Sequence, residues 1–421
     1  MSRDAATTDR LAGRRKNEGA ANHPWVAMKS GWKTRPLGEV CQVIGGGTPS
    51  KGRNEYYVGK IPWATVRDMR AEVISETECK ITKEAVKSSA TNIIPGGNVV
   101  IATRVGLGKV CLLEQDTAIN QDLRGIVPND PKTLSVRFLF SWLKSVAHLI
   151  VAEGTGATVQ GVKLPFIKSL QVPLPPLAEQ QRIVGILDEA FDGLSTAKAN
   201  AEQNLQNARA LFESHLQSVF TQRGNHPIVP IANVAEVFDG PHATPKTVDA
   251  GPVFLGIGAL QDGKVNLRET RHVTPKDFQQ WTRRVKPRTD DIVFSYETRL
   301  GQAAIIPEGL ECCLGRRMGL VRVDRKRVDP RFFVYQYISS PFREFLSSRT
   351  VRGATVDRIA LKEFPSFQIT LPPLAEQESI ANQFDTLRAQ TQRLESIYQQ
   401  KLAALGDLKK SLLHEAFTGQ L

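Results

Sequence analysis

The sequence has few cysteines and no long apolar run. Its five cysteines are too few for a disulfide framework in a chain of this length, and none forms a C-x-x-C pair, which fits a reducing compartment. No stretch of about 18 consecutive apolar residues occurs, so the sequence predicts no membrane-spanning helix. The first residues lack an apolar signal core. We therefore expect a cytoplasmic protein that does not bind a membrane.

The sequence also lacks the motifs of common catalytic sites. There is no G-x-x-x-x-G-K-[ST] phosphate loop, because "GGGTPSKG" has its glycines and lysine in the wrong order and "GLGK" is too short. There is no G-x-S-x-G elbow, and "HEAFT" lacks the second histidine of a zinc helix. No glycine-rich cofactor loop accompanies an Asn/Asp-Pro-Pro-aromatic motif, and "PNDPK" lacks the second acidic residue of a nuclease site. We expect no catalytic residues and no metal site.

Length and charge leave several classes of protein open. A chain of 421 residues exceeds one ordinary core, so two or more domains are expected. Hydrophobic residues make up 41% and charged residues 23%, which is typical of a folded, soluble protein. The formal net charge of +12 favours a polyanionic partner such as nucleic acid. A basic protein that binds no nucleic acid is the alternative.

One seven-residue phrase occurs twice. LPPLAEQ stands at 174–180 and again at 371–377, an offset of 197 positions. The same offset aligns GATV at 156–159 with GATV at 353–356, and Phe-Thr at 220–221 with Phe-Thr at 417–418. Upstream the similarity is weaker and needs gaps, but Arg104 aligns with Arg299, and Thr48 with Thr244. The chain is therefore two tandem copies of one unit, with the last part of each copy the more similar.

The last part of each copy predicts a long helix. Pro-Pro ends the preceding extended segment, and an acidic residue follows near the positive end of the helix. Apolar residues then recur at steps of three and four without an internal proline. These residues are Ile183, Leu187, Ala190, Leu194, Ala197, Ala201, Ala208 and Leu211, then Phe384, Leu387, Leu394, Tyr398, Leu405, Leu408 and Leu412. A helix of about 65 Å exceeds a domain diameter, so we expect a coiled coil.

These features predict a fold class and its boundaries. We expect an α+β protein in which two globular domains are each followed by a long helix. The helices are expected to pair as an antiparallel coiled coil with pseudo-two-fold symmetry, because a compact segment of about 145 residues separates them. The predicted segments are a disordered extension at 1–28, with Met28 a candidate start, domains at 29–173 and 226–370, and helical spacers at 174–225 and 371–421.

These segments resemble a known family. The two stretches "PLPPLAEQQRIVGILD" and "LPPLAEQESIANQFDTL", the opening "GGGTPSKGRNEYYVGKIPWATVRDM" and the ending "LLHEAFTGQL" are similar to the specificity subunit of type I restriction-modification systems. The resemblance covers nearly all of residues 28–421. It implies two target-recognition domains that each bind half of a split DNA site, with the helices as the spacer between them.

The resemblance also implies partners. Two methyltransferase subunits would bind the pseudo-symmetric body, and motor-nuclease restriction subunits would complete the complex. S-adenosylmethionine, ATP and magnesium would belong to those partners, so this chain is expected to need no cofactor. Half-sites about one helical turn apart, roughly 34 Å, would be read by domains of this size. Because the two domains differ in sequence, the target is expected to be asymmetric.

Candidate DNA contacts lie in loops where a basic or amide side chain stands beside glycine, threonine or an aromatic residue. Arginine suits guanine edges and glutamine suits adenine, whereas lysine and threonine suit phosphate. The candidates are Thr48, Ser50, Lys51, Arg53, Thr65, Arg67, Arg104, Gln121 and Arg124, then His242, Thr244, Lys246, Tyr296, Thr298, Arg299, Arg316, Arg317 and Arg352. For each, the alternative is a solvated charge or a buried turn residue. Trp63 is expected in the core, and the aligned Arg104 and Arg299 are the preferred pair.

Other functions remain open from the sequence. A stand-alone nuclease or methyltransferase would need cofactor motifs that the sequence lacks. A coiled-coil scaffold that joins two protein-binding domains would show no salt-sensitive DNA affinity. A specificity subunit of a methylation-only system would share all the features above. By family analogy alone, the polar helix faces and the LPPLAEQ segments are candidate docking sites for methyltransferase subunits.

Overall fold

The computed structural model of the chain describes residues 29–155, 161–222, 224–351 and 357–421. The chain divides into two compact units. The first comprises the described residues up to Ala199 together with Leu402–Leu421, and the second is Asn200–Lys401. Each unit therefore combines one globular part with a portion of each of two long helices.

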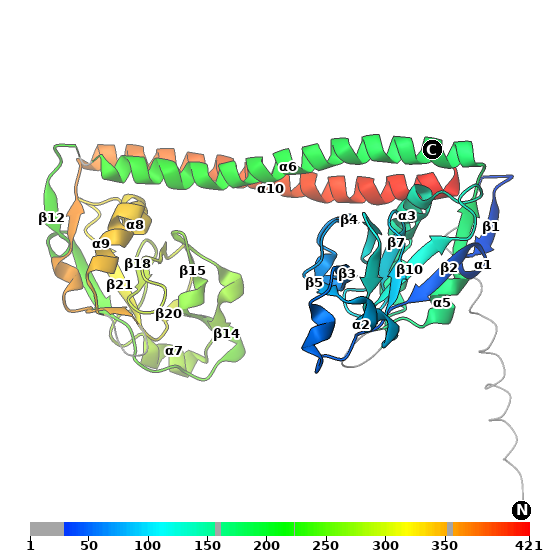
Figure 1. The fold of residues 1–421 in the computed structure, drawn as a ribbon. Coiled ribbons are helices and arrows are strands. Elements are labelled where there is room, and N and C mark those ends of the chain that lie inside the picture. Colours follow the sequence, from blue (N-terminus) through cyan, green and yellow to red (C-terminus); the bar gives the residue numbers. More distant parts are fainter. Residues whose placement is uncertain (1–28, 156–160, 223, 352–356) are drawn as a thin grey trace, which may run out of the picture. The chain divides into compact units, whose positions relative to one another are not determined.

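The globular part of the first unit is built on a five-stranded sheet (Figure 1). Its strand order is β2-β10-β7-β8-β4. The strands are β2 (Cys41–Gly45), β10 (Leu123–Pro128), β7 (Val99–Ala102), β8 (Val110–Leu113) and β4 (Val73–Ile74). A second sheet has the order β5-β3-β9-β6, with β3 and β9 parallel. Its strands are β5 (Cys79–Ile81), β3 (Ile61–Ala64), β9 (Thr117–Ile119) and β6 (Asn92–Ile94).

Short elements complete this unit. A two-stranded ribbon pairs β1 (Lys33–Pro36) with β11 (Gln171–Leu174) immediately before the long helix. The helices are α1 (Leu37–Val40), η1 (Asn54–Tyr57), η2 (Val66–Asp68), α2 (Lys83–Lys87), α3 (Val136–Ser145), α4 (Ala147–Ala152) and α5 (Leu164–Ser169).

Strand β7 is covered on both faces and packs against a different layer on each. All four of its residues are buried, and they alternate between two cores. Val99 and Ile101 pack with α3 and the long helices, whereas Val100 and Ala102 pack in a separate cluster with residues of the second sheet. A strand that is covered on both faces needs a continuous apolar run, which "VVIA" supplies.

The second unit repeats this topology with one strand fewer in each sheet. Its main sheet has the order β13-β21-β18-β19, and its second sheet has the order β17-β14-β20 with β14 and β20 parallel. The strands are β13 (Ala235–Asp239), β21 (Met318–Val323), β18 (Ile292–Ser295), β19 (Ala303–Ile305), β17 (Arg271–His272), β14 (Val248–Leu255) and β20 (Cys312–Leu314). The central strand β18 again divides its side chains, with Phe294 in one core and Val293 in another.

The remaining elements of the second unit are short. The ribbon before the second long helix pairs β12 (Ile228–Pro230) with β24 (Gln368–Thr370). The others are β15 (Leu260–Gln261), β16 (Lys264–Val265), β22 (Thr350–Val351), β23 (Arg358–Ile359), η3 (Ile231–Asn233), η4 (Ile257–Ala259), η5 (Leu267–Glu269), α7 (Pro275–Trp281), α8 (Pro330–Ile338), α9 (Ser340–Ser348) and η6 (Phe364–Ser366). The repeat seen in the sequence is thus a repeat of strand order.

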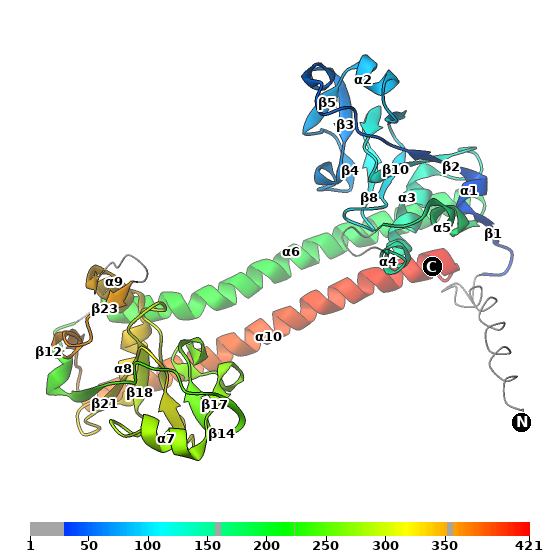
Figure 2. The ribbon, with the colours of Figure 1, turned by 90° about the horizontal axis from the view of Figure 1, so that it is seen from below.

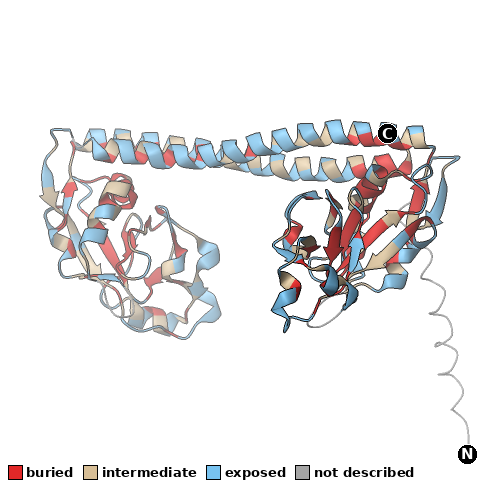
Figure 3. Ribbon diagram, in the orientation of Figure 1, coloured by how far each residue is buried: buried red, intermediate tan, exposed pale blue. Residues whose placement is uncertain are grey.

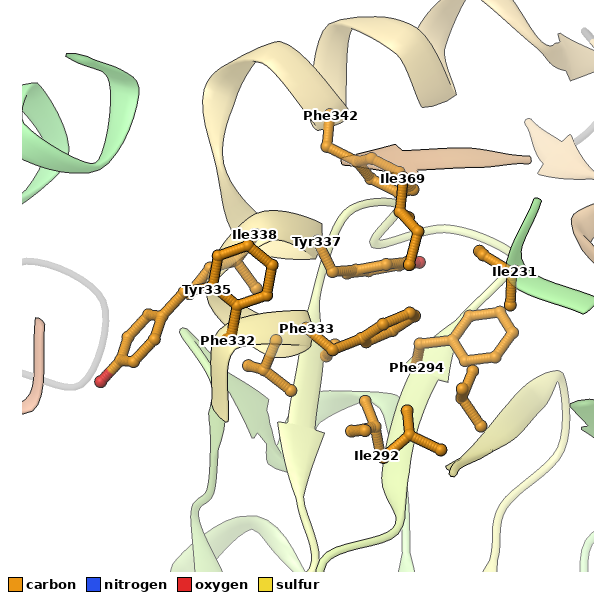
Figure 4. Close-up of a cluster of buried hydrophobic side chains, with 14 of the residues drawn as sticks. Ile231, Ile292, Phe294, Phe332, Phe333, Tyr335, Tyr337, Ile338, Phe342 and Ile369 are labelled. Atoms are coloured by element: carbon orange, nitrogen blue, oxygen red, sulfur yellow. The ribbon is translucent and has the colours of Figure 1, made fainter. Parts of the chain in front are cut away.

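An aromatic cluster forms the core of the second unit (Figure 4). Helix α8 contributes Phe333 and Tyr337, which lie beside Phe294 of β18, and Phe332, whose ring centroid is 5.5 Å from that of Phe220. The Phe294 ring stacks on Phe364 with centroids 4.3 Å apart. Buried aromatic residues of this kind typically stabilise a core by about 3–5 kcal/mol relative to alanine.

The long helices are α6 (Leu177–Thr221) and α10 (Leu374–Thr418). In the first unit the start of α6 packs against the end of α10, where Leu187 and Phe417 share a core. In the second unit the end of α6 packs against the start of α10, where Phe220 stacks on Phe384. The pairing is therefore antiparallel in each unit (Figure 2), which confirms the predicted fold class. The buried residues of each helix lie mainly near its two ends (Figure 3).

The glutamine of LPPLAEQ has the same structural role in both copies. Gln180 is fully buried, and its Oε1 accepts a hydrogen bond from the Ser135 amide at 2.9 Å. Its Nε2 donates to the carbonyls of Thr133 and Pro175, both at 2.9 Å. Gln377 is also fully buried and does the same with the Asp329 amide and the carbonyls of Arg327 and Pro372. This glutamine therefore ties the helix start to the loop before α3 or α8, so it is not available for docking a partner.

No helix among the described residues is long and apolar enough to cross a membrane.

The glutamine contacts predict a stability effect. We expect Gln180→Ala to lower the free energy of unfolding by about 2–3 kcal/mol, because one amide and two carbonyls lose their partner in a buried place. The neighbouring Gln181→Ala is the control, since Gln181 is exposed on the same helix turn. Thermal unfolding of both variants measures the difference, and equal melting temperatures would contradict this role.

Candidate nucleic-acid interface

In the first unit, strand register brings four loops to one edge of the sheets. The end of β2 at Gly45 pairs with Arg124 at the start of β10, and Leu123 pairs with Ala102 at the end of β7. The parallel strands β3 and β9 end side by side at Ala64 and Ile119. The loops that follow these strand ends must therefore converge. They are residues 46–53, 65–68, 103–109 and 120–122.

These loops enclose a hollow of about 410 Å³. Five of the predicted residues line it, namely Thr48, Lys51, Thr65, Arg67 and Gln121. The glycines before Thr48 allow the loop to press against its neighbour, because a Cβ on Gly46 would lie 2.2 Å from the Asn120 carbonyl. The Thr48 hydroxyl donates to the Gln121 amide oxygen, which joins two of the converging loops. The structure thus brings together residues that lie up to 73 positions apart in the sequence.

Acidic and basic groups form hydrogen bonds and an ion pair at the rim of this hollow. Asp68 is 8% exposed and accepts hydrogen bonds from the Thr65 amide at 2.7 Å and the Thr65 hydroxyl at 3.0 Å. Arg104 lies 3.5 Å from Asp122, and Arg124 donates to the Gln121 carbonyl at 3.0 Å. Burial and the nearby charge of Arg104 lower the pKa of Arg124. Arg104 and Arg124 therefore add positive charge beside the hollow.

The other predicted residues of this unit lie on the first loop or beneath it. Ser50 is exposed, and the Arg53 guanidinium donates to the Tyr56 hydroxyl at 2.8 Å. Trp63 is 7% exposed and donates from its indole nitrogen to the Gly47 carbonyl at 3.2 Å. The prediction that Trp63 belongs to the core is confirmed, and its hydrogen bond supports the loop that carries Thr48.

The second unit has the same arrangement of loops. Asp239 at the end of β13 pairs with Gly319 near the start of β21, and Ser295 at the end of β18 pairs with Met318. The parallel strands β14 and β20 end together at Leu255 and Leu314. Residues 240–247, 256–259, 296–302 and 315–317 therefore converge at the equivalent edge.

A hollow of about 600 Å³ lies at this edge. Asp239 is central to it, because its Oδ2 lies 2.8 Å from His242 Nε2 and 3.7 Å from the Arg284 guanidinium. The Tyr296 hydroxyl donates to Asp239 Oδ1 at 3.0 Å. Tyr296 is 6% exposed, and burial raises its pKa. Tyr296 therefore does not offer its side chain at the surface as expected. It instead positions Asp239, because its ring belongs to the core.

The remaining predicted residues of the second unit are distributed along the converging loops. Thr244 and Lys246 are exposed on the loop after β13, and Arg316 is exposed before β21. Arg299 donates to the Gly258 carbonyl at 3.2 Å, which joins two of the loops. Arg317 is held in an ion pair with Glu297 at 2.5 Å. Arg352 lies outside the described residues.

Backbone strain marks two of these positions. Thr298 and Arg317 have φ values of +69° and +64°, a region that residues other than glycine rarely adopt. Such conformations cost free energy and tend to occur at binding sites. Both residues lie on loops at the convergent edge.

Four residues of the second hollow were not predicted. Gln280, Trp281, Arg283 and Arg284 line it from the end of α7 and the turn that follows. The sequence contains the signal, because "QQWTRR" places amide and basic side chains beside an aromatic residue. The position of this segment in the site was not recognisable, since Gln280 and Arg284 are 41 and 45 positions from Asp239 in the sequence.

Four of the five cysteines are buried, and the fifth lies at the first hollow. Burial raises the pKa of Cys41, Cys312 and Cys313 to about 12, and that of Cys111 to about 11. Cys79 is exposed and lines the first hollow. Within the described ranges, no group of three histidine, cysteine or carboxylate side chains is placed to hold a metal ion. The arrangement offers hydrogen-bond donors, acceptors and positive charge.

Comparison with known proteins identifies the family. The family model described as "Type I restriction modification DNA specificity domain" matches residues 29–206 and 253–403, which is most of the chain and falls in both copies. The chain belongs to the type I restriction modification DNA specificity family. The resemblance drawn from LPPLAEQ and its helices is thereby confirmed.

Curated members of the specificity family align with different lengths of the chain. The EcoR124I/EcoR124II specificity subunit of Escherichia coli is 34% identical over 203 residues, which cover 46% of this chain and 49% of that protein. The MjaIX specificity subunit of Methanocaldococcus jannaschii is 29% identical over 44% of this chain and 43% of its own length. The alignments therefore span about half the length of these two relatives. The putative MjaX specificity subunit of the same organism is 25% identical over 93% of both chains.

Solved structures share the fold of the specificity family. A chain from a study titled "Structural basis underlying complex assembly and conformational transition of the type I R-M system" has a TM-score of 0.74 at 20% identity, covering 94% of this chain and 99% of that one. The HsdS subunit of Thermoanaerobacter tengcongensis has a TM-score of 0.61 at 19% identity, covering 94% and 98%. These likenesses support the two-domain, two-helix architecture.

The cysteines provide a test of the first hollow. We expect Cys79 to react rapidly with a thiol reagent in the folded protein, because the other four thiols are buried and resist ionisation. Cys79→Ser should abolish the fast phase. Bound DNA that covers the hollow should slow alkylation of Cys79 in proportion to the fraction of protein bound. An unchanged rate at saturating DNA would place the DNA elsewhere.

Proposed function

We propose that the chain is a sequence-specific DNA-recognition subunit of a type I restriction-modification complex. Each globular part binds one half of a bipartite, asymmetric site in double-stranded DNA. The converging loops around the two hollows supply the contacts. The chain itself carries out no chemical step.

One observation carries this proposal. In both units the shared strand order places a hollow at the edge where the loops converge, but the linings differ: four loops line the first hollow, whereas one loop and the turn after α7 line most of the second. The first hollow presents Lys51, Arg67 and Gln121, and the second presents His242 and Arg284 among others. A shared scaffold with different donors and acceptors is what two unlike half-sites require, because base edges are distinguished by their hydrogen-bonding pattern.

The remaining partners are assigned by chemistry and family. We propose that two methyltransferase subunits bind the repeated scaffold and that motor-nuclease subunits join them. S-adenosylmethionine, ATP and magnesium are then bound by those subunits. A complex that acts on chromosomal DNA works in the cytoplasm, and a net charge of +12 favours association with the DNA backbone.

DNA binding by single variants tests the contacts. Lys51→Ala should weaken binding to all sequences and reduce the slope of log affinity against log salt by about 1, as loss of a phosphate contact does. Arg284→Ala should cost about 1–3 kcal/mol and relax base preference in one half-site only, as loss of a base contact does. Titrations at several salt concentrations measure both effects.

Matched controls lie at the opposite ends of the same strands. Lys132 follows β10 and Lys326 follows β21, and both are exposed. Lys132→Ala and Lys326→Ala should leave affinity and base preference unchanged. If the controls and the hollow variants have equal effects, the hollows are not the contact sites.

Methylome sequencing tests the function itself. A host with the methyltransferase partner should methylate one bipartite, asymmetric motif only when this chain is present. The Arg284→Ala strain should keep one half of the motif strict and relax the other. Absence of any dependent motif, together with salt-independent or absent DNA binding, would favour a scaffold that joins protein-binding domains.

A further inference from the structure

Most apolar residues at the contacts between α6 and α10 are similar on the two helices, so they do not determine which helix pairs with which. Positions 197 apart hold similar apolar side chains near the helix ends. These pairs are Ile183 and Ile380, Leu187 and Phe384, Leu216 and Leu413, and Phe220 and Phe417. Judged by these residues alone, α6 of one chain would fit α6 of a second copy about as well as it fits α10.

Two cation–aromatic contacts do distinguish the helices. In the first unit, the Lys409 ammonium of α10 lies 4.8 Å from the ring centroid of Phe191 on α6. In the second unit, the Arg388 guanidinium of α10 lies 4.6 Å from the ring centroid of Phe212 on α6. Phe191 and Arg388 are 197 positions apart, and so are Phe212 and Lys409. The same two positions thus carry aromatic residues on α6 and cations on α10.

An ion pair adds a third distinguishing contact. Arg209 Nε of α6 lies 3.1 Å from Glu395 Oε2 of α10. The position 197 after Arg209 is Gly406, and the position 197 before Glu395 is Lys198. The equivalent contact in the other unit therefore has no opposite charges.

The antiparallel register shows what pairing of like helices would bring together. Two copies of α6 would place Arg209 of one chain opposite Lys198 of the other. Two copies of α10 would place Arg388 of one chain opposite Lys409 of the other. Like charges in these places oppose pairing, whereas α6 with α10 gives attraction at all three contacts.

The local surroundings make these contacts strong. Arg388 is 7% exposed and lies between Phe212 and Tyr335, whose ring centroid is 4.9 Å away. The pKa of Lys409 is lowered by burial and by the charge of Lys144. Both cations are therefore partly or fully removed from water, where cation–aromatic attraction and like-charge repulsion are larger than at an exposed site.

We propose that Phe191–Lys409, Phe212–Arg388 and Arg209–Glu395 form a pairing code. The code makes α6 pair with α10 of its own chain and excludes pairing of like helices with a second copy.

Inverting the code tests the aromatic contacts. In the full chain, Phe191→Lys with Phe212→Arg places cations opposite Lys409 and Arg388, and should lower the melting temperature by about 5 °C or more. Adding Arg388→Phe and Lys409→Phe restores aromatic–cation pairs with exchanged helices and should recover most of that loss. Leu211→Arg is the control, because Leu211 is 50% exposed beside Phe212. If the fourfold variant is no more stable than the twofold one, the proposal is overturned.

Converting the like-charge pairs tests the exclusion of a second copy. The double variant Lys198→Glu with Lys409→Glu would place a carboxylate opposite Arg209 when two α6 helices pair, and opposite Arg388 when two α10 helices pair. It would also remove the Phe191–Lys409 contact. The solution mass of this variant should rise to two chains at concentrations where the wild type shows one. Lys401→Glu with Lys410→Glu is the matched control at exposed positions. A variant mass of one chain at every concentration would overturn the proposal.

Discussion

Each of the two units needs residues from both long helices to complete its core, and the rest of the structure depends on this constraint. The first unit buries Phe417 from the end of α10 beside Leu187 from α6. The second buries Phe384 from the start of α10 beside Phe212 and Phe220 from α6. Loss of one such aromatic side chain typically costs about 3–5 kcal/mol, so neither unit is stable without apolar residues from both helix ends. The helices are therefore parts of the two cores, and their pairing fixes which residues each core receives.

That scaffold leaves one sheet edge free for variation. Both main sheets have buried faces, with α3 or α8 and the long helices on one side and the second sheet on the other. Substitutions on these faces would disturb a core, whereas most residues of the loops beyond the strand ends lie outside these cores. Thr48 and Gln121 in one copy, and His242 and Arg284 in the other, can therefore line hollows beside this edge without sequence similarity.

Periodic and local features were predictable from the sequence. Apolar steps of three and four and the Pro-Pro boundary indicated the helices, which begin at Leu177 and Leu374, three residues after the predicted starts of their segments. Glycine and turn residues mark loops in the sequence, and five residues predicted from these loops line the first hollow. Long-range packing was not predictable. Tyr296 resembles a surface aromatic until the core beneath β18 is known, and Gln180 resembles any polar residue of a helix start until the loop before α3 meets it.

The division of the chain into units has a consequence for its synthesis. The second unit is one continuous segment, Asn200–Lys401, whereas the first needs Leu402–Leu421 from the end of the chain. A ribosome that has finished the first globular part has not yet made Leu413, Ala416 and Phe417, which belong to its core. Because domains fold as their residues emerge, the second unit can close before the first, against the order of translation. The first unit therefore keeps an exposed apolar face until the last turns of α10 have left the ribosome.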